Sequence, residues 1–437
     1  MIPNGGISCN RFHGPLHAMA VSVLCVVATT TSRITAMPVK PADTTLATVV
    51  DLARRREYFR LRDLVSSSGA ATEPAWLYAQ AVVERAFNRP AASNAAIDTA
   101  LRRGDLPDSA VARLRKMKVE NDLRLQHYRS GLAAADTLLD MSRYLPKAAI
   151  HDLRNTRKIL AVLVDVPPQR LVRRGPTRVR IDHGRIPVRI GDSARTYVFD
   201  TGANLSALMR SEATALGLHI RPAGIEVGTS TDVKVTTDLA VAPVLRIGGL
   251  EFHDVVFLVV DDAQLTFGDF RIPGIIGFPV IEQMGEVHVH TSGLLTVPVE
   301  QTAQREANFA LDGHTALTLV TVRGERMVCR LDTGANKTQL YEPFYRRFQR
   351  DLGDGAQADT FALGGAGGVR HLPGFRLPVL EMAVGDTTLT LQDVALLTQP
   401  LVTDSDDNYL FCNVGQDVLQ AFSEYTLDFR NMAFLLR

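Results

Sequence analysis

The sequence predicts a multi-domain protein: an N-terminal all-α region of helical hairpins, followed by an all-β region of two lobes related by a pseudo-twofold axis. Three observations carry this prediction. Residues 42–165 are rich in Ala, Leu and Arg, and apolar residues recur there at intervals of three and four, which is typical of helices. From about residue 177 onward, Val, Ile, Thr and Leu alternate with polar residues between Gly and Asp turns, as in antiparallel strands. Within this second region, an ordered set of motifs occurs twice.

The first 36 residues have the order of an export signal. Arg11 and His13 precede an apolar run over 18–28, and small residues follow it up to Ala36. The run is shorter than the roughly 20 residues that a membrane-spanning helix needs, so no stable membrane span is expected. We therefore expect a signal peptide over residues 1–36 and a periplasmic or secreted protein. An untidy N-terminus or a misassigned start codon is the alternative.

Charge and cysteine content exclude several classes of partner and site. The 437 residues carry 48 Lys and Arg against 47 Asp and Glu, a net charge of +1, which gives no reason to expect a nucleic-acid partner. No CxxC or HExxH motif occurs, so we expect no metal and no cofactor. His288 and His290 share one face of an expected strand, but two histidines alone are more often structural than metal ligands.

The helical region, residues 42–165, divides at turn-forming residues. Phe87 and Tyr128 precede two turns that lead into helices beginning with small residues. This resembles tetratricopeptide-type helix pairs, which recruit protein partners, although any all-helical domain shows much of the same pattern. A linker is expected over 166–176, which contains Pro167-Pro168. The expected helices cover 75–87, 91–103, 109–127, 132–141 and 147–163.

The internal repeat is the feature that decides the interpretation of the β region. Residues 199–204 read Phe-Asp-Thr-Gly-Ala-Asn, and residues 331–336 read Leu-Asp-Thr-Gly-Ala-Asn, 132 positions later. An apolar-apolar-Gly segment ending at Gly277 is matched by Asn-Val-Gly ending at Gly415. A strand-like segment then closes each half. A lone Asp-Thr-Gly is common and Asp often occupies turns, but the ordered repeat predicts two related lobes, residues 177–300 and 305–437.

These motifs resemble those of retropepsin- and pepsin-type aspartic peptidases, and they are most similar to the bacterial retropepsin-like group, here with two lobes fused in one chain. The resemblance covers about residues 176–437. It implies an all-β bilobal aspartic-peptidase fold and a monomer whose single chain completes a pseudo-dimeric catalytic unit. It also implies catalytic roles for Asp200 and Asp332. The residues that it assigns to supporting the catalytic loops are Thr201, Gly202, Thr333, Gly334, Gly277 and Gly415.

The chemistry of two carboxyl groups in one site fits peptide hydrolysis. Like charges at close range cannot both form easily, so the pair holds one proton over a broad pH range. The ionised member then takes a proton from water, and the protonated member donates to the scissile carbonyl oxygen. Ala203 and Ala335 follow the glycines as in the retropepsin branch, which implies activity towards weakly acidic or neutral pH.

Glycine-bearing segments between each Asp motif and each closing glycine are expected to form flap hairpins. Their backbone groups are suited to pairing with an extended peptide, and plain flexible hairpins are the alternative. The flap residues that we expect to bind substrate are Gly228, Thr229 and Ser230 in lobe one, and Gly364, Gly365 and Ala366 in lobe two.

Lobe two carries two further points of interest. Asn413 stands where lobe one has Ile275; it is expected to bond the loop beneath Asp332 or line the cleft, or else to mark a lobe that has drifted from catalysis. Cys329 and Cys412 lie on strands that are close together in the resembled fold. We hypothesise a disulfide between them; two buried free thiols are the alternative.

The leading functional hypothesis is therefore an aspartic endopeptidase that acts on a peptide or protein substrate. A second hypothesis is a non-catalytic peptide-binding or scaffold protein that retains the fold, with the helical region recruiting partners. A third is that the helical region is autoinhibitory and is shed as a pro-segment would be.

Overall fold

The computed structural model describes residues 45–67, 74–228, 234–267, 269–300, 304–352, 355–365, 368–401 and 409–437. The expected signal peptide lies outside the described residues, as do the expected flap residues Thr229, Ser230 and Ala366. Within the described ranges, no helix is both long and apolar enough to cross a membrane.

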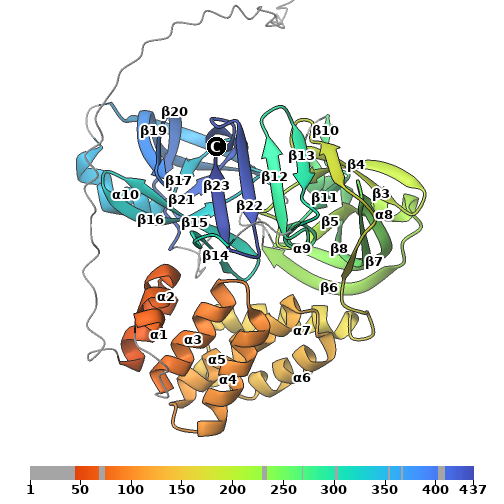
Figure 1. The fold of residues 1–437 in the computed structure, drawn as a ribbon, viewed down its shortest axis with the longest axis vertical. Helices are drawn as coiled ribbons and strands as arrows, with labels where there is room; N and C mark the ends of the chain where they lie inside the picture. The colour runs from red at the N-terminus through yellow and green to blue at the C-terminus, as the bar shows by residue number, and fades with distance from the viewer. Residues whose placement is uncertain are drawn as a thin grey trace, which may run out of the picture. The chain divides into compact units, whose positions relative to one another are not determined.

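The described chain begins with helices, as the sequence predicts (Figure 1). Helix α4 begins at Pro90, whose fixed φ suits the first helical position. Its last residue is Arg103, and Gly104, with a φ of 73°, ends the helix as its C-terminal cap. The helices are α1 (Leu46–Arg54), α2 (Tyr58–Ser67), α3 (Pro74–Ala86), α4 (Pro90–Arg103), α5 (Asp108–Arg124), α6 (Tyr128–Leu139) and α7 (Lys147–Val162).

Two details of the helical region differ from the prediction. Helices α1 and α2 were not among the expected elements; both are short, and Thr45 caps α1 by accepting a hydrogen bond from the Thr48 amide. Tyr128 does not precede the turn but is the first residue of α6. Its ring is buried, so it anchors the first turn of that helix in the core.

The first lobe is built on one sheet with the strand order β1-β8-β5-β11-β4-β3-β7-β6. The expected linker over 166–176 contains strand β1, because Leu171 and Val172 pair with the edge of β8 opposite Phe252 and Glu251. Short helices α8 (Arg210–Ala215) and α9 (Phe278–Gln283) follow β5 and β11. The strands are β1 (Arg170–Arg173), β3 (Arg185–Ile190), β4 (Ser193–Phe199), β5 (Ser206–Met209), β6 (Ile220–Gly228), β7 (Lys234–Ile247), β8 (Leu250–Val260) and β11 (Gly274–Ile276).

The second lobe repeats the plan of the first. Strand β11 lies parallel to β4 in lobe one, and β21 lies parallel to β16 in lobe two. Helices α10 (Glu342–Phe348) and α11 (Gln416–Leu419) match α8 and α9. The strands are β14 (Phe309–Asp312), β15 (Thr315–Val322), β16 (Glu325–Leu331), β17 (Gln339–Leu340), β18 (Gln357–Gly365), β19 (Gly368–Val384), β20 (Thr387–Leu397) and β21 (Cys412–Val414).

A third sheet joins the lobes, with the order β2-β13-β12-β22-β23 (Figure 1). Strand β12 (Glu286–His290) ends lobe one and pairs antiparallel with β22 (Glu424–Asp428) of lobe two. The remaining strands are β2 (Thr177–Arg180), β13 (Leu294–Val297) and β23 (Ala433–Leu436). Phe429 packs edge-on against Phe278 and Phe309, with ring centroids 5.6 and 5.7 Å apart. The contact between Phe278 and Phe429 crosses between the lobes, and aromatic contacts of this kind stabilise such an interface.

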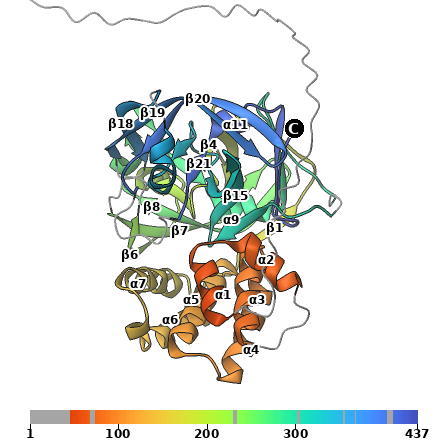
Figure 2. The same ribbon diagram turned by 90° about the vertical axis from the view of Figure 1, so that its left-hand side faces the viewer.

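The helices pack directly against the lobes. Helix α7 lies against β6 of lobe one (Figure 2). Helix α3 lies against β14 of lobe two (Figure 1). Leu160 of α7 and Ile225 of β6 are buried in the same hydrophobic cluster. On the other lobe, the Asp312 carboxylate accepts hydrogen bonds from Arg56 Nε at 2.7 Å and from the Tyr58 hydroxyl at 3.0 Å. The helical region therefore shares its core and its buried charges with both lobes.

Candidate active site

The two Asp-Thr-Gly loops sit in matching frames. Asp200 follows β4, and its amide donates to the Ile276 carbonyl of β11 at 3.0 Å. Asp332 follows β16, and its amide donates to the Val414 carbonyl of β21, also at 3.0 Å. In each lobe, the strand that leads to the aspartate is thus clamped by the parallel strand beside it. The two copies of the sequence repeat therefore have the same backbone arrangement around their aspartates.

Thr201 and Thr333 join the loops to each other. The Thr201 amide donates to Thr333 Oγ1 at 3.0 Å, and the Thr333 amide donates to Thr201 Oγ1 at 3.1 Å. Each hydroxyl in turn donates to a backbone carbonyl of the opposite lobe, at Leu331 and Phe199 respectively. Both side chains are almost fully buried. Because buried hydrogen bonds are costly to break, this reciprocal set fixes the spacing of the two aspartates.

The glycines of the loops face the carboxyl groups of the opposite lobe. A Cβ atom on Gly202 would lie 2.6 Å from Asp332 Oδ1, and one on Gly334 would lie 2.5 Å from Asp200 Cγ. Their amides also donate within their own loops, from Gly202 to Asp200 Oδ1 at 2.7 Å and from Gly334 to Asp332 Oδ1 at 3.0 Å. Only glycine therefore allows the two carboxyl groups to approach each other.

The two carboxyl groups share a site in which one of them resists ionisation. Burial, together with the negative charge and hydrogen bond of Asp332, raises the pKa of Asp200 to about 7, although the positive charge of Arg330 and the Gly202 amide act in the opposite direction. Close carboxyl groups titrate as a pair, so the dyad holds a proton well above the usual range of an aspartate.

The closing glycines, Gly277 and Gly415, lie next to the segments that follow the Asp-Thr-Gly loops. The Gly277 amide donates to Ser206 Oγ at 3.0 Å, and the Gly415 amide donates to Thr338 Oγ1 at 3.1 Å. A side chain at either glycine would run into backbone, at 2.6 Å from Leu205 and 2.7 Å from Lys337 respectively. The structure thus brings all the expected loop-supporting residues together around the two aspartates.

Two polar side chains lie beside Asp332. Asn413 Nδ2 donates to Asp332 Oδ2 at 3.2 Å, which is a bond to the carboxyl group itself rather than to the loop beneath it. Its neighbour across the parallel strands is Arg330, which the sequence prediction missed. The sequence did contain a sign of its importance, because the repeat aligns Arg330, a cation, with Val198, an apolar residue.

The expected flap residues lie at the ends of long antiparallel hairpins. Gly228 ends β6 and pairs with Lys234 of β7. In lobe two, Gly364 and Gly365 end β18, and Gly365 pairs with Gly368 of β19. The hairpins occupy equivalent places in the two lobes, after α8 and α10 respectively.

Cys329 and Cys412 are joined by a disulfide. They are direct neighbours on the parallel strands β16 and β21, and both are buried. The bridge therefore fastens together the two strands that lead to Asp332 and Gly415.

Comparison with known proteins gives a family match for the first lobe. Residues 186–280, from β3 into α9, match the family model described as aspartyl protease. The chain resembles the aspartyl proteases. The matched range contains Asp200 and Gly277 of the first aspartyl protease-like lobe. Among solved structures, a retropepsin-like aspartic protease from Rickettsia conorii matches at 18% identity and a TM-score of 0.22, covering 29% of this chain and 92% of that chain. No curated protein matches the chain.

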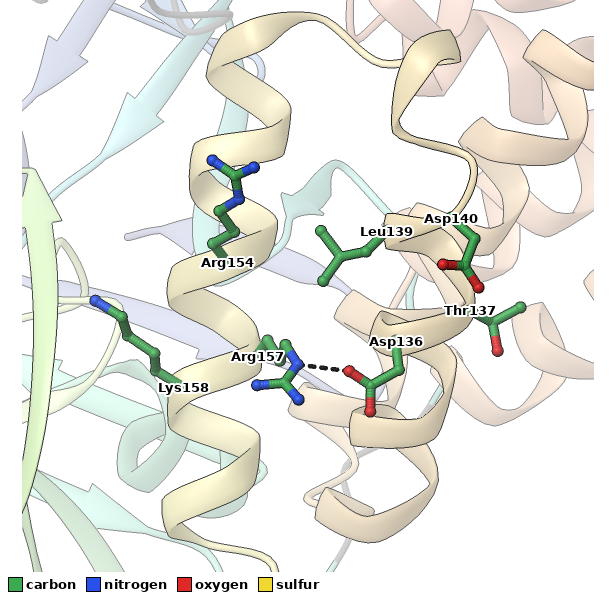
Figure 3. A pocket seen from close by; sticks show the side chains of 7 residues that line it. All are labelled: Asp136, Thr137, Leu139, Asp140, Arg154, Arg157 and Lys158. Atoms are coloured by element: carbon green, nitrogen blue, oxygen red, sulfur yellow. Dashed lines mark hydrogen bonds and ion pairs between the residues drawn. The ribbon is translucent and has the colours of Figure 1, made fainter.

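Other parts of the molecule lie outside this aspartyl protease-like centre. A surface hollow of about 720 Å³ lies between α6 and α7, and it is lined by none of the loop residues above (Figure 3). Its polar lining includes Asp136, Arg154 and Arg157. In the part of the chain that the structure describes, no group of three or more His, Cys, Asp or Glu side chains is placed to hold a metal ion.

Proposed function

We propose that this protein is an aspartic endopeptidase in which Asp200 and Asp332 together activate a water molecule. The observation that carries the proposal is the placement of the two carboxyl groups. One comes from each lobe, both stand in the same backbone frame, and each faces a glycine of the opposite loop. A pair of turn-capping aspartates would not need the reciprocal threonine bonds between the lobes.

The chemistry follows from one shared proton. The ionised carboxylate takes a proton from the water, and the water oxygen attacks the scissile carbonyl carbon. At the same time the protonated carboxyl group donates its proton to the carbonyl oxygen. The tetrahedral intermediate then collapses. The carboxyl group that took a proton from the water gives it to the amide nitrogen, and the other carboxylate takes a proton from a hydroxyl group of the intermediate as the carbon–nitrogen bond breaks. The dyad ends in its starting state.

The working pH follows from the proton-binding strength of the dyad. Activity requires one proton on the pair, and burial raises the pKa of Asp200 to about 7. The dyad therefore keeps its proton up to near-neutral pH and loses it above. We expect activity to extend from weakly acidic to neutral pH. A rate profile confined to strongly acidic conditions would contradict this assignment.

The substrate that fits the site is an extended peptide. The β6–β7 and β18–β19 hairpins end in glycines at Gly228, Gly364 and Gly365, and backbone groups of such hairpins pair with an added strand. One chain supplies both carboxyl groups, which supports a monomeric enzyme. We also propose that the protein is exported, since the Cys329–Cys412 disulfide is typical of oxidising compartments.

The helical region is proposed to be a working part of the enzyme rather than a removable pro-segment. Arg56 pairs with Asp312, and the two side chains are only 18% and 13% exposed. Removing residues 42–165 would take away Arg56 and would expose the apolar side chains of both lobes that pack against the helices, which is destabilising. Comparing the chain with and without residues 42–165 tests this: loss of folding supports an integral role, and a gain in activity supports autoinhibition.

The proposal is tested by digesting a peptide library at several pH values. We expect cleavage by the wild type, inhibition by a statine-type peptide, and no cleavage by Asp200→Asn. The exposed Asp192, on the same lobe, provides the control variant Asp192→Asn, which should cleave normally. A wild type that binds peptides without cleaving them would favour the scaffold alternative, and cleavage unchanged in Asp200→Asn would refute the catalytic assignment.

A further inference from the structure

A cation and an amide converge on one oxygen of the dyad. Arg330 Nη2 lies 3.7 Å from Asp332 Oδ2, and Asn413 Nδ2 donates to the same oxygen at 3.2 Å. Asn413 is 5% exposed, and the Arg330 side chain is 28% exposed. A cation and a hydrogen-bond donor are therefore directed at the same oxygen.

At the equivalent positions beside Asp200, lobe one has two apolar residues. Val198 and Ile275 are neighbours on β4 and β11, at the positions that Arg330 and Asn413 occupy on β16 and β21. Their aliphatic side chains neither donate hydrogen bonds nor carry charge. The two lobes therefore share a backbone frame and differ in the chemistry beside their aspartates.

Arg330 also crosses between the lobes. Its Nη2 donates to the Gly202 carbonyl of the lobe-one loop, and a Cβ atom on Gly202 would lie 2.6 Å from that nitrogen. The guanidinium is thus held at the junction of the two loops rather than on the outer surface. An arginine cannot lose its proton under ordinary conditions, so this positive charge is permanent.

We infer that Arg330 and Asn413 are positioning residues that localise the negative charge of the dyad on Asp332 and leave the shared proton on Asp200. The inference rests on the proposed function and assigns a different role in it to each aspartate. Asp332 takes the proton from the attacking water, and Asp200 donates to the carbonyl oxygen. In the second half, Asp332 returns its proton to the leaving nitrogen, and Asp200 recovers one from the intermediate.

The direction of the pH effect follows from the charges that face the pair. The charged groups acting on Asp200 are Asp332, which raises its pKa, and Arg330, which lowers it. Removing Arg330 therefore strengthens proton binding by the dyad. An opposite charge at this range shifts a carboxyl titration by about one pH unit or more, and partial exposure places the effect at the lower end.

The first experiment is the pH dependence of kcat/KM. Arg330→Val and Asn413→Ile each install the lobe-one residue, Arg330→Lys keeps the charge, and Arg326→Val removes an exposed cation from the same strand. In Arg330→Val, both limbs of the pH profile should move about one pH unit to higher pH. Asn413→Ile should show a smaller shift in the same direction, and Arg330→Lys and Arg326→Val should show little shift. Coincident profiles for the first two variants and the wild type, or movement to lower pH, would overturn the inference.

The second experiment needs no turnover. Carbon-13 labelling of the Asp carboxyl groups, with Asp200→Asn and Asp332→Asn used for assignment, reports each group by NMR. Near pH 5.5 (about one unit above the ordinary range), Asp332 should give a carboxylate signal while Asp200 gives a carboxylic acid signal, and Arg330→Val should make the two alike. Ionisation of Asp200 first would refute the charge assignment. The assigned order of ionisation in a chain without peptidase activity would instead refute only the proposed function.

Discussion

Thr201 and Thr333 exchange hydrogen bonds across the lobe boundary, each backbone amide donating to the other's Oγ1 at 3.0 and 3.1 Å. The exchange is symmetric although the lobes differ elsewhere. Each Asp-Thr-Gly loop therefore supports the other, so the geometry of Asp200 depends on lobe two and that of Asp332 depends on lobe one.

Removing one of these hydroxyls should therefore destabilise the protein and impair the site. Thr201→Val keeps the shape but leaves the Thr333 amide and the Leu331 carbonyl without that partner. We expect a loss of about 1–3 kcal/mol in the free energy of unfolding, measured by chemical denaturation, and a fall in kcat. Thr388→Val, at an exposed position of β20, is the control. A Thr201 variant as stable and as active as this control would argue against the loop-coupling role.

His314 should make the fold sensitive to acid. It lies in the β14–β15 turn with its ring 5.6 Å from Phe278. Burial, assisted by the positive charges of Arg124 and Arg85, lowers the pKa of His314 to about 3. The unfolded chain binds a proton below about pH 6.5 that the folded chain excludes, so stability falls as the pH drops from about 6.5 towards 3.

The Tm of the wild type should accordingly fall over that pH range, and His314→Gln should flatten the dependence. His183→Gln, at a side chain that is 94% exposed, should leave it unchanged. Parallel Tm curves for His314→Gln and the wild type would rule out this histidine as the source of the acid sensitivity.

The disulfide should contribute measurably to stability, because Cys329 and Cys412 are 83 residues apart in sequence. Cross-links that close long loops typically contribute about 2–4 kcal/mol. Thiol titration of the denatured, unreduced protein without residues 1–36 should find no free thiol. A reductant should lower the denaturation midpoint of the wild type but not that of the double Cys→Ala variant; free thiols in the titration would contradict the bridge.

Helix α7 should restrain the first flap. Asn155 Oδ1 accepts the Glu226 amide of β6 at 3.3 Å, and Lys158 Nζ donates to the Gly224 carbonyl at 2.7 Å. Asn155→Ala should speed hydrogen exchange at Glu226 about fivefold, for the loss of about 1 kcal/mol, and should raise KM more than it changes kcat. Arg154→Ala, in the hollow between α6 and α7 (Figure 3), is the matched control. Equal exchange in both variants would show that the helix does not hold the flap.

The sequence predicted the repeat and the paired loops because their requirements are local. Each aspartate needs an apolar strand before it and a glycine two residues after it, and both are visible in the sequence within a few residues of Asp200 and Asp332. Strand β1 was missed because its pairing with β8 lies about 80 residues away. Arg330 was missed for a similar reason: its importance depends on Gly202, 128 residues earlier, and on Asn413, which meets it only in the parallel register of β16 and β21.

The contacts of the helical region were equally hidden. Arg56 stands in a run of three arginines that suggests a solvated helix face, yet it pairs with Asp312, 256 residues later. Local composition does not distinguish a surface cation from one that is buried by a distant turn. Contacts between residues this far apart in sequence, such as Arg56 with Asp312, connect the helices to the lobes.

The central claim is that Asp200 and Asp332 act as one unit, and the rate of peptide cleavage by the two single Asp→Asn variants and the double variant tests it most directly. Residues that act together are not additive in their effects on rate. Each single variant should therefore lose as much activity as the double variant, while Asp386→Asn, at an exposed position of lobe two, keeps the wild-type rate. Wild-type cleavage by Asp332→Asn would contradict the claim.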